Sequence, residues 1–149
     1  MMSRPAIVPF ATTLRVKDSC LCLHTQRAAR ALARRFDQVL RPFGLTNGQF
    51  SLLMSLNRPE PPGMAPVAEL LAMDRTTLTA ALKPLERRGL VEIITDPEDR
   101  RSRHLKLTTE GATVLAAAVP VWDQTHRDVE ALLSAGEPDR LRHDLRLLS

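Results

Sequence analysis

The sequence contains no tyrosine, and its other aromatic residues are few, namely four phenylalanines and one tryptophan in 149 residues. The core must therefore be aliphatic. The two cysteines lie close together in the stretch DSCLCLH, which excludes a disulfide framework and favours a reducing compartment. No apolar run approaches the roughly 18 residues that a membrane span needs. Pro9 also interrupts the short apolar patch near the start, so no signal peptide is expected and we predict a cytoplasmic protein.

Motifs of catalysis and metal binding are also missing from the sequence. It has no GxGxxG, GxSxG, HExxH or paired-carboxylate motif, so it is not predicted to be an enzyme or to need a cofactor. Cys20, Cys22 and His24 alternate along the chain, and residues two apart on a helix point about 200° apart. These side chains would not converge on a metal ion, so no metal site is predicted.

The charge balance is basic but uneven. The net charge is +4 and the isoelectric point is near 9.8, which permits a polyanionic partner. Residues 1–41 hold eight of the basic residues and only two of the acidic ones. The excess therefore lies in the first part of the chain, and net charge alone does not establish nucleic-acid binding.

Helical segments dominate the predicted secondary structure. Apolar residues recur at helical spacing over 17–41, until Pro42 and Gly44 end the segment. Thr46 and Gln49 have the form of a capping box that opens a second helix, which runs to about residue 57. Further helices are expected over 66–72, 75–87, 109–134 with a bend at Pro120, and 137–147.

A helix-break-helix followed by a hairpin occupies the middle of the chain. Asp74 can cap the helix 75–87, and Gly89 follows its end. Strands are predicted over 90–95 and 103–107, joined by the charged stretch DPEDRRS. This is the order of elements in a winged helix-turn-helix.

The helix 75–87 has two different faces. Leu78, Leu82 and Leu85 form an apolar stripe, and the opposite stripe is polar and begins with Thr76 and Thr79. An α-helix fits the major groove of B-DNA, and its first turns present side chains to base edges. Arginines at the hairpin tip suit the narrow, electronegative minor groove, where phosphates would relieve their mutual repulsion.

The run LLAMDRTTLTAALKPLERRGLVEIITDPEDRRSRHLKLTTEG resembles the MarR family of bacterial transcription regulators. The hairpin carries the family's wing pattern as Asp99, Arg101, Leu105, Leu107 and Thr108, with Gly111 after it. The resemblance covers about residues 17–147. It implies a single domain, 1–149, mainly α with a small β-hairpin wing. Within it the resemblance places a winged helix-turn-helix lobe over 46–108 and helical dimerisation arms over 17–45 and 109–149.

The resemblance also implies what the chain binds. A homodimer would place two recognition helices about one helical turn apart on double-stranded DNA with an inverted repeat. Arg101 would enter the minor groove, Arg100 or Arg103 would contact phosphate, and Asp99 would brace the wing through a salt bridge. The predicted DNA-binding residues are Arg75, Thr76, Thr77, Thr79, Lys83, Arg87, Asp99, Arg100, Arg101 and Arg103.

Two positions depart from the family pattern. Ala80 stands where many relatives carry Arg or Lys, so one phosphate contact is expected to be missing. Pro84 lies inside the recognition helix and removes the hydrogen bond to the carbonyl of Ala80. Because the base-reading turns precede Pro84, we expect a kink without loss of function. Lys83 and Arg87 have two alternative interpretations of equal weight: they belong to a solvated helix face, or they contact DNA phosphates.

Other residues allow two interpretations each. Cys22 lies near where the organic-hydroperoxide-sensing branch of the family carries its reactive cysteine, yet that branch uses tyrosine hydroxyls that this chain lacks. Cys20 and Cys22 are otherwise small apolar residues. The family often binds a small aromatic or amphipathic effector, for which Arg27 would suit a carboxylate and Phe50 an aromatic ring. The candidate effector residues are His24, Arg27, Phe50, Met54 and Trp122, and each can equally serve packing.

The sequence thus predicts a regulator, in the first place a repressor, that occupies a palindromic operator as a homodimer and responds to a small molecule. A peroxide sensor using Cys22 is one alternative. A winged-helix module that contacts only another protein is a second, and it predicts no salt-dependent DNA binding.

Overall fold

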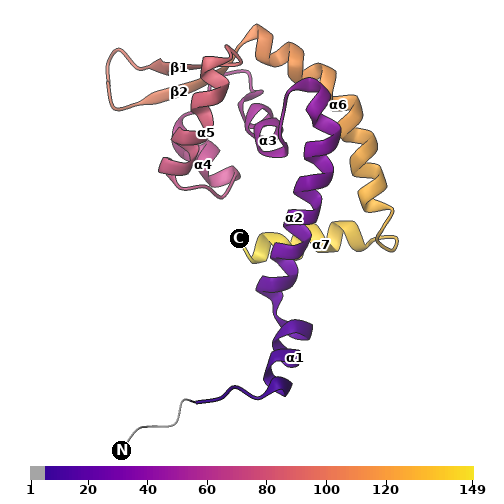
Figure 1. Cartoon of the computed structure of the whole chain (residues 1–149). Coiled ribbons are helices and arrows are strands. Elements are labelled where there is room, and N and C mark those ends of the chain that lie inside the picture. Colours follow the sequence, from indigo (N-terminus) through magenta and orange to yellow (C-terminus); the bar gives the residue numbers. More distant parts are fainter. Residues whose placement is uncertain (1–5) are drawn as a thin grey trace, which may run out of the picture. The chain divides into compact units, whose positions relative to one another are not determined.

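The computed structural model describes residues 6–149 and shows a mainly α-helical chain with one β-hairpin (Figure 1). Two compact units can be distinguished, one up to Arg35 and one from Phe36 to Ser149. The elements are α1 Phe10–Ser19, α2 Leu21–Leu40, the 3₁₀ turn η1 Arg41–Phe43, α3 Asn47–Leu56, α4 Met64–Leu70, α5 Arg75–Arg87, β1 Val91–Thr95, β2 Arg103–Leu107, α6 Thr109–Glu130 and α7 Glu137–Leu147. Each helix within residues 6–149 is too short or too polar to cross a membrane.

The single helix predicted over 17–41 is wrong at its N-terminal end. Cys20 has an extended backbone (φ −70°, ψ 110°) that separates α1 from α2. Its N–H donates to the Val16 carbonyl at 2.9 Å and closes α1, while its thiol accepts from the Leu23 N–H at 3.4 Å at the start of α2. The break changes the ψ angle of Cys20 alone, and the apolar residues before and after Cys20 keep their helical spacing. For this reason the sequence pattern did not reveal the break.

The other helices agree with the sequence to within a few residues. α4 begins at Met64, two residues before the predicted start, because Pro66 is acceptable anywhere in a first turn whose N–H groups have no helical partner. α6 ends at Glu130 instead of residue 134. α5 and α6 run without interruption past Pro84 and Pro120.

The start of α3 is fastened by two sets of hydrogen bonds. The predicted capping box is confirmed, since the Thr46 hydroxyl accepts from the Gln49 N–H and the Gln49 side chain accepts from the Thr46 N–H, each at 3.1 Å. Asp37 adds a second anchor from α2, because its carboxylate accepts from the N–H and the side-chain amide of Asn47 at 2.7 and 2.8 Å. The backbone hydrogen bond from Asn47 lowers the pKa of Asp37, and the side-chain bond adds to the effect.

This anchor gives a pH-dependent stability. We expect Asp37→Ala to lower the free energy of unfolding by about 1–2 kcal/mol at neutral pH, as for hydrogen bonds to a charged group. Because the pKa of Asp37 lies lower in the folded than in the unfolded chain, its contribution is full above about pH 4 and is lost as the pH falls through the folded value. Urea unfolding of the parent and the variant between neutral and acidic pH measures the difference. A difference that stayed constant on acidification would contradict the charged hydrogen bond.

The core of the second unit is aliphatic, as the scarcity of aromatic residues predicts. Its fully buried side chains are Leu40, Leu52, Leu53, Leu56, Val67, Leu78, Leu82, Leu85, Val91 and Leu105. They come from the end of α2, from α3, α4 and α5, and from both strands, so one core supports the helix-break-helix and the wing together.

The wing is an antiparallel pair in which Val91 faces Leu107 and Thr95 faces Arg103. β2 is also held on its other edge, where the Leu105 N–H donates to the Pro62 carbonyl at 2.8 Å. Leu105 is fully buried between these neighbours. The base of the wing is therefore rigidly joined to the core, while the residues between the strands extend beyond α5 (Figure 1).

Candidate nucleic-acid interface

The candidate recognition helix, α5, begins where a tight break turns the chain. Ala72 takes a positive φ of 52° in this break, a conformation that costs energy for a residue other than glycine. Asp74 then caps α5, accepting from the Thr77 N–H at 2.7 Å, and this hydrogen bond lowers the pKa of Asp74. The cap therefore carries a negative charge at neutral pH, which also suits the positive end of the helix dipole.

The two faces of α5 lie as the sequence predicts. Leu78, Leu82 and Leu85 are buried. The Thr79 hydroxyl donates to the Arg75 carbonyl at 2.8 Å, so its hydrogen is already engaged. The hydroxyl oxygen can still accept a hydrogen bond, and the methyl group of Thr79 can still form apolar contacts. The four residues predicted for the opposite stripe, Thr76, Thr79, Lys83 and Arg87, are exposed, and so are Arg75 and Thr77, the other two predicted DNA-binding residues of α5.

A hollow between α5 and the wing brings together residues that are far apart in the sequence. It measures about 280 Å³. From α5 it is lined by Arg75 and Thr79, and from the wing by Arg101 and Arg103. Met64, Leu82 and Ile93 complete the lining. Four of the predicted DNA-binding residues thus share one surface, while Lys83, Arg87, Asp99 and Arg100 are exposed outside this lining.

The wing tip is braced by carboxylates that accept from backbone groups. Asp96 accepts from the Glu98 N–H at 2.9 Å, and Asp99 accepts from the Arg101 N–H at 3.0 Å. The salt bridge predicted for Asp99 is wrong: within residues 6–149 its carboxylate forms no ion pair. The physical reason is that a backbone N–H two residues away is already in place, whereas an exposed arginine gains little from pairing in water.

This arrangement leaves the wing cations available. Arg103 donates to the hydroxyl of Thr95, its partner on β1, at 2.8 Å, and this hydrogen bond directs its side chain across the hairpin. The guanidinium groups of Arg100 and Arg101 form no ion pair among the described residues. Both guanidinium groups are exposed at the end of a braced hairpin, whose tip also carries Asp96, Glu98 and Asp99.

Arg88 has a role that the sequence did not reveal. Its guanidinium donates to the Gly44 carbonyl at 2.8 Å and so connects the end of α5 to the turn before α3. Gly44 has a positive φ of 69°. The two residues are 44 positions apart, and no local pattern could have paired them.

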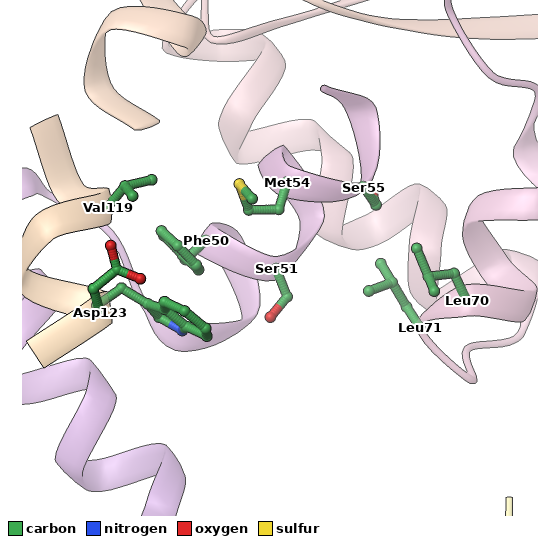
Figure 2. Close-up of a pocket in the computed structure, with 9 residues that line it drawn as sticks. Phe50, Ser51, Met54, Ser55, Leu70, Leu71, Val119 and Asp123 are labelled. Atoms are coloured by element: carbon green, nitrogen blue, oxygen red, sulfur yellow. The ribbon is translucent and has the colours of Figure 1, made fainter. Parts of the chain in front are cut away.

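A second site is a cavity of about 510 Å³ between α3, the end of α4 and α6 (Figure 2). Three of the predicted effector residues, Phe50, Met54 and Trp122, line it. Residues that the sequence did not single out make up the rest, namely Ser51, Ser55, Leu70, Leu71, Val119 and Asp123. The other two predicted residues, His24 and Arg27, belong to the compact unit that ends at Arg35.

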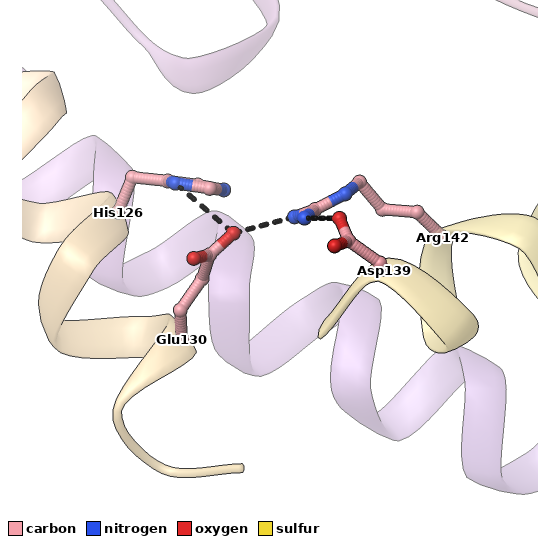
Figure 3. A network of polar contacts seen from close by, with 4 residues as sticks. All are labelled: His126, Glu130, Asp139 and Arg142. Carbon is pink, nitrogen blue, oxygen red and sulfur yellow. Dashed lines mark hydrogen bonds and ion pairs between the residues drawn. The ribbon is translucent and has the colours of Figure 1, made fainter. Parts of the chain in front are cut away.

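Aromatic rings stack on one another at the α6 side of this cavity. The rings of Phe50 and Trp122 stack at 5.9 Å, and His126 stacks on Trp122 at 4.8 Å. His126 lies 3.7 Å from Glu130, which in turn pairs with Arg142 of α7 (Figure 3). Arg142 also pairs with Asp139, and these hydrogen bonds raise its pKa. The network holds α7 against the end of α6.

The cysteines lie in the first unit. Cys22 is exposed in the first turn of α2, and its thiol accepts from the Gln26 amide at 3.1 Å. Lys17, the basic residue nearest to Cys22 on its N-terminal side in the sequence, pairs with Asp18 at 3.5 Å. Over residues 6–149, no group of three or more His, Cys, Asp or Glu side chains could hold a metal ion.

A helix-break-helix whose second helix exposes polar residues, followed by a basic hairpin, defines a winged helix-turn-helix protein. Residues 45–102 match the sequence profile of the MarR family. The transcriptional repressor MprA of Escherichia coli strain K12 is 31% identical over 131 residues, which cover 86% of this chain and 72% of that protein. The chain therefore belongs to the MarR family.

Solved structures agree with this assignment. The transcriptional regulator MosR of M. tuberculosis, in complex with DNA, is 38% identical with a TM-score of 0.79, over 87% of this chain and 93% of that chain. The transcriptional repressor CouR bound to a 23-mer DNA duplex is 28% identical with a TM-score of 0.79, over 96% and 99% of the two chains. The chain is a transcriptional regulator and not an enzyme.

Proposed function

We propose that this chain is a cytoplasmic bacterial repressor that binds a palindromic operator as a homodimer and responds to a small-molecule effector. The observation that carries the proposal is the hollow that Arg75 and Thr79 of α5 share with Arg101 and Arg103 of the wing. A helix and a basic hairpin that converge in this way can engage adjacent grooves of one duplex.

Each predicted residue has a place in this complex. The first turns of α5, with Arg75, Thr76 and Thr77, would enter the major groove, where the methyl group of Thr79 can meet a thymine methyl. Arg101 would enter the minor groove, with Asp99 holding the backbone at the tip. The remaining cations would contact phosphates, which position the protein without reading sequence. These are Lys83, Arg87, Arg100 and Arg103.

Exposed apolar side chains support the homodimer. α2 exposes Leu21 and Leu32, at 68% and 39%, and α7 exposes Leu145 and Leu147, at 41% and 73%. A monomer would leave these apolar groups in water, which is unfavourable. We propose that 17–45 and 109–149 form the dimer region and that 46–108 forms the DNA-binding lobe. Sedimentation equilibrium should give twice the chain mass of 16.6 kDa.

The cavity of about 510 Å³ is the proposed effector site. Its wall includes Leu70 and Leu71, the last residue of α4 and the one after it, and the cap of α5 follows at Asp74. A ligand that displaced this wall would therefore change the orientation of α5. It would lower DNA affinity only if it bound the DNA-incompetent form better than the other form.

The first test is fluorescence anisotropy of a labelled DNA fragment from upstream of the gene, beside a scrambled duplex. We expect specific binding with a Kd of about 10⁻⁸ M or tighter, falling steeply as salt is added. Absence of binding to either duplex at low salt, and to duplexes selected from a random pool, would favour the protein-interaction module instead.

A thiol-based sensor is the second candidate, because Cys22 is exposed in the first turn of α2 and accepts a hydrogen bond from Gln26. On this proposal a stoichiometric organic hydroperoxide would weaken operator binding of the parent and of Cys20→Ser, but not of Cys22→Ser. An affinity that the peroxide left unchanged in the parent would remove this candidate.

A further inference from the structure

The lining of the cavity between α3, α4 and α6 has one charged side chain, and that side chain is a carboxylate. Phe50, Met54, Leu70, Leu71, Val119 and Trp122 make it mainly apolar. Ser51 and Ser55 contribute hydroxyls, and the Ser55 hydroxyl donates to the Leu52 carbonyl at 2.6 Å. Asp123 is the charged member, and no lysine, arginine or histidine belongs to this lining.

Asp123 also differs from the acidic residues that follow it on α6. The Asp128 carboxylate accepts from the Gln124 amide at 2.9 Å, and Glu130 pairs with Arg142. Among the described residues Asp123 has neither a hydrogen-bond donor nor an ion-pair partner for its side chain. It is half-buried. Figure 2 shows it with Val119 on the α6 wall, across the cavity from Leu70 and Leu71.

An unpaired, half-buried carboxylate selects ligands by charge. It has lost part of its hydration, and a cation at the same site would compensate for that loss, whereas a ligand carboxylate would be repelled. The apolar remainder of the wall favours a ligand whose body is apolar. Phe50 and Trp122, whose rings stack on each other at 5.9 Å, add aromatic surface to this wall, which suits an aromatic ligand or a cation.

We infer that this cavity binds a compact hydrophobic cation, an aromatic amine or quaternary ammonium compound, with Asp123 as its counter-ion. The inference rests on the proposed effector site and names the class of its ligand. The charge of this ligand is opposite to the one expected from the sequence, where Arg27 suggested a ligand with a carboxylate. The cavity volume of about 510 Å³ lies within the range of roughly 300–1,000 Å³ for small-molecule sites.

The test uses three probes that share a biphenylmethyl body and differ in the charge of the group attached to it: biphenylmethyl-trimethylammonium, biphenylmethanol and biphenylacetate. Trp122 lines the cavity and is the only tryptophan of the chain, so titration of the full chain can be followed by its fluorescence. We expect the cation to bind about tenfold tighter than the alcohol, as one partly desolvated charge pair contributes about that factor. The acetate should bind most weakly.

Asp123→Asn removes the charge and keeps the shape. In this variant the preference for the cation over the alcohol should fall below about threefold, while the affinity for the alcohol stays as in the parent. Asp128→Asn is the matched control, because it neutralises a carboxylate of the same helix that is no part of the cavity lining. It should keep the full preference.

The outcomes separate this inference from the proposed regulator. Equal binding of the three probes, or tightest binding of the acetate, would overturn the cationic ligand. So would a cation preference that survives in Asp123→Asn. No binding of any probe, with operator binding intact, would also overturn it and leave the DNA-binding function in place. Loss of the proposed function itself would appear separately, as failure to bind the operator without any probe.

Discussion

Replacing Arg101 by alanine is expected to weaken operator binding by about 1–3 kcal/mol, roughly a factor of 5 to 150. Arg101 is exposed at the wing tip, forms no ion pair among the described residues, and lines the hollow beside Arg75 and Thr79. The variant would lack the cation proposed to enter the minor groove of the operator, while the fold of the protein would stay intact. Anisotropy over a salt series measures the loss, and the salt slope should become shallower by about one charge.

Arg127→Ala provides the matched control for this prediction. Arg127 is an exposed arginine near the end of α6, where it donates to Gln124 at 2.9 Å. The variant removes the same charge from the chain but leaves the wing untouched, so its operator affinity should stay close to that of the parent. Equal affinities of Arg101→Ala, Arg127→Ala and the parent would show that Arg101 does not enter the minor groove.

The largest effect on stability is expected from Gly111→Ala, in the first turn of α6. A methyl group on Gly111 would overlap the Leu90 carbonyl oxygen and would lie 2.8 Å from a methyl carbon of Leu107. The carbonyl cannot retreat freely, because it accepts from the Thr108 N–H at 3.2 Å. We expect the free energy of unfolding to fall by about 1–3 kcal/mol or more, as in other overpacked cores.

Gly48→Ala is the control for Gly111→Ala. Gly48 also lies in the first turn of a helix, α3, but a methyl group there would meet only the Thr46 hydroxyl oxygen, at 4.0 Å. Because alanine is the better helix former, this variant should be neutral or more stable by up to about 1 kcal/mol. Urea unfolding of both variants compares them, and equal stabilities would disprove the close approach of α6 to Leu90.

Much of the winged lobe could be predicted because its signals are local. The capping residues Thr46 and Asp74 bond to N–H groups three residues further on, and both caps are confirmed. The buried stripe of Leu78, Leu82 and Leu85 follows from helical spacing alone. Predictions from local patterns were wrong at two places. The helix break at Cys20 was missed because the apolar periodicity continues across it. The Asp99 carboxylate accepts from a backbone N–H instead of forming the predicted salt bridge.

The effector cavity shows the limit of such signals. Phe50, Met54 and Trp122 were candidates because of their residue types. Leu70 and Leu71 could not be distinguished from core leucines, and Asp123 could not be distinguished from the other acidic residues of a helix. Their shared cavity arises only when α3, α4 and α6 pack together.

The sequence by itself determined the helices with their caps and faces, the hairpin with its basic tip, and the family to which the chain belongs. These properties depend on residues within a few positions of one another, whose spacing sets hydrogen bonds and exposure. Only the tertiary structure decided that Arg75 and Arg101 share one hollow, that Arg88 holds Gly44, and that Asp123 stands unpaired in an apolar cavity. Contacts between distant segments depend on how the buried faces pack, and a linear pattern does not contain that packing.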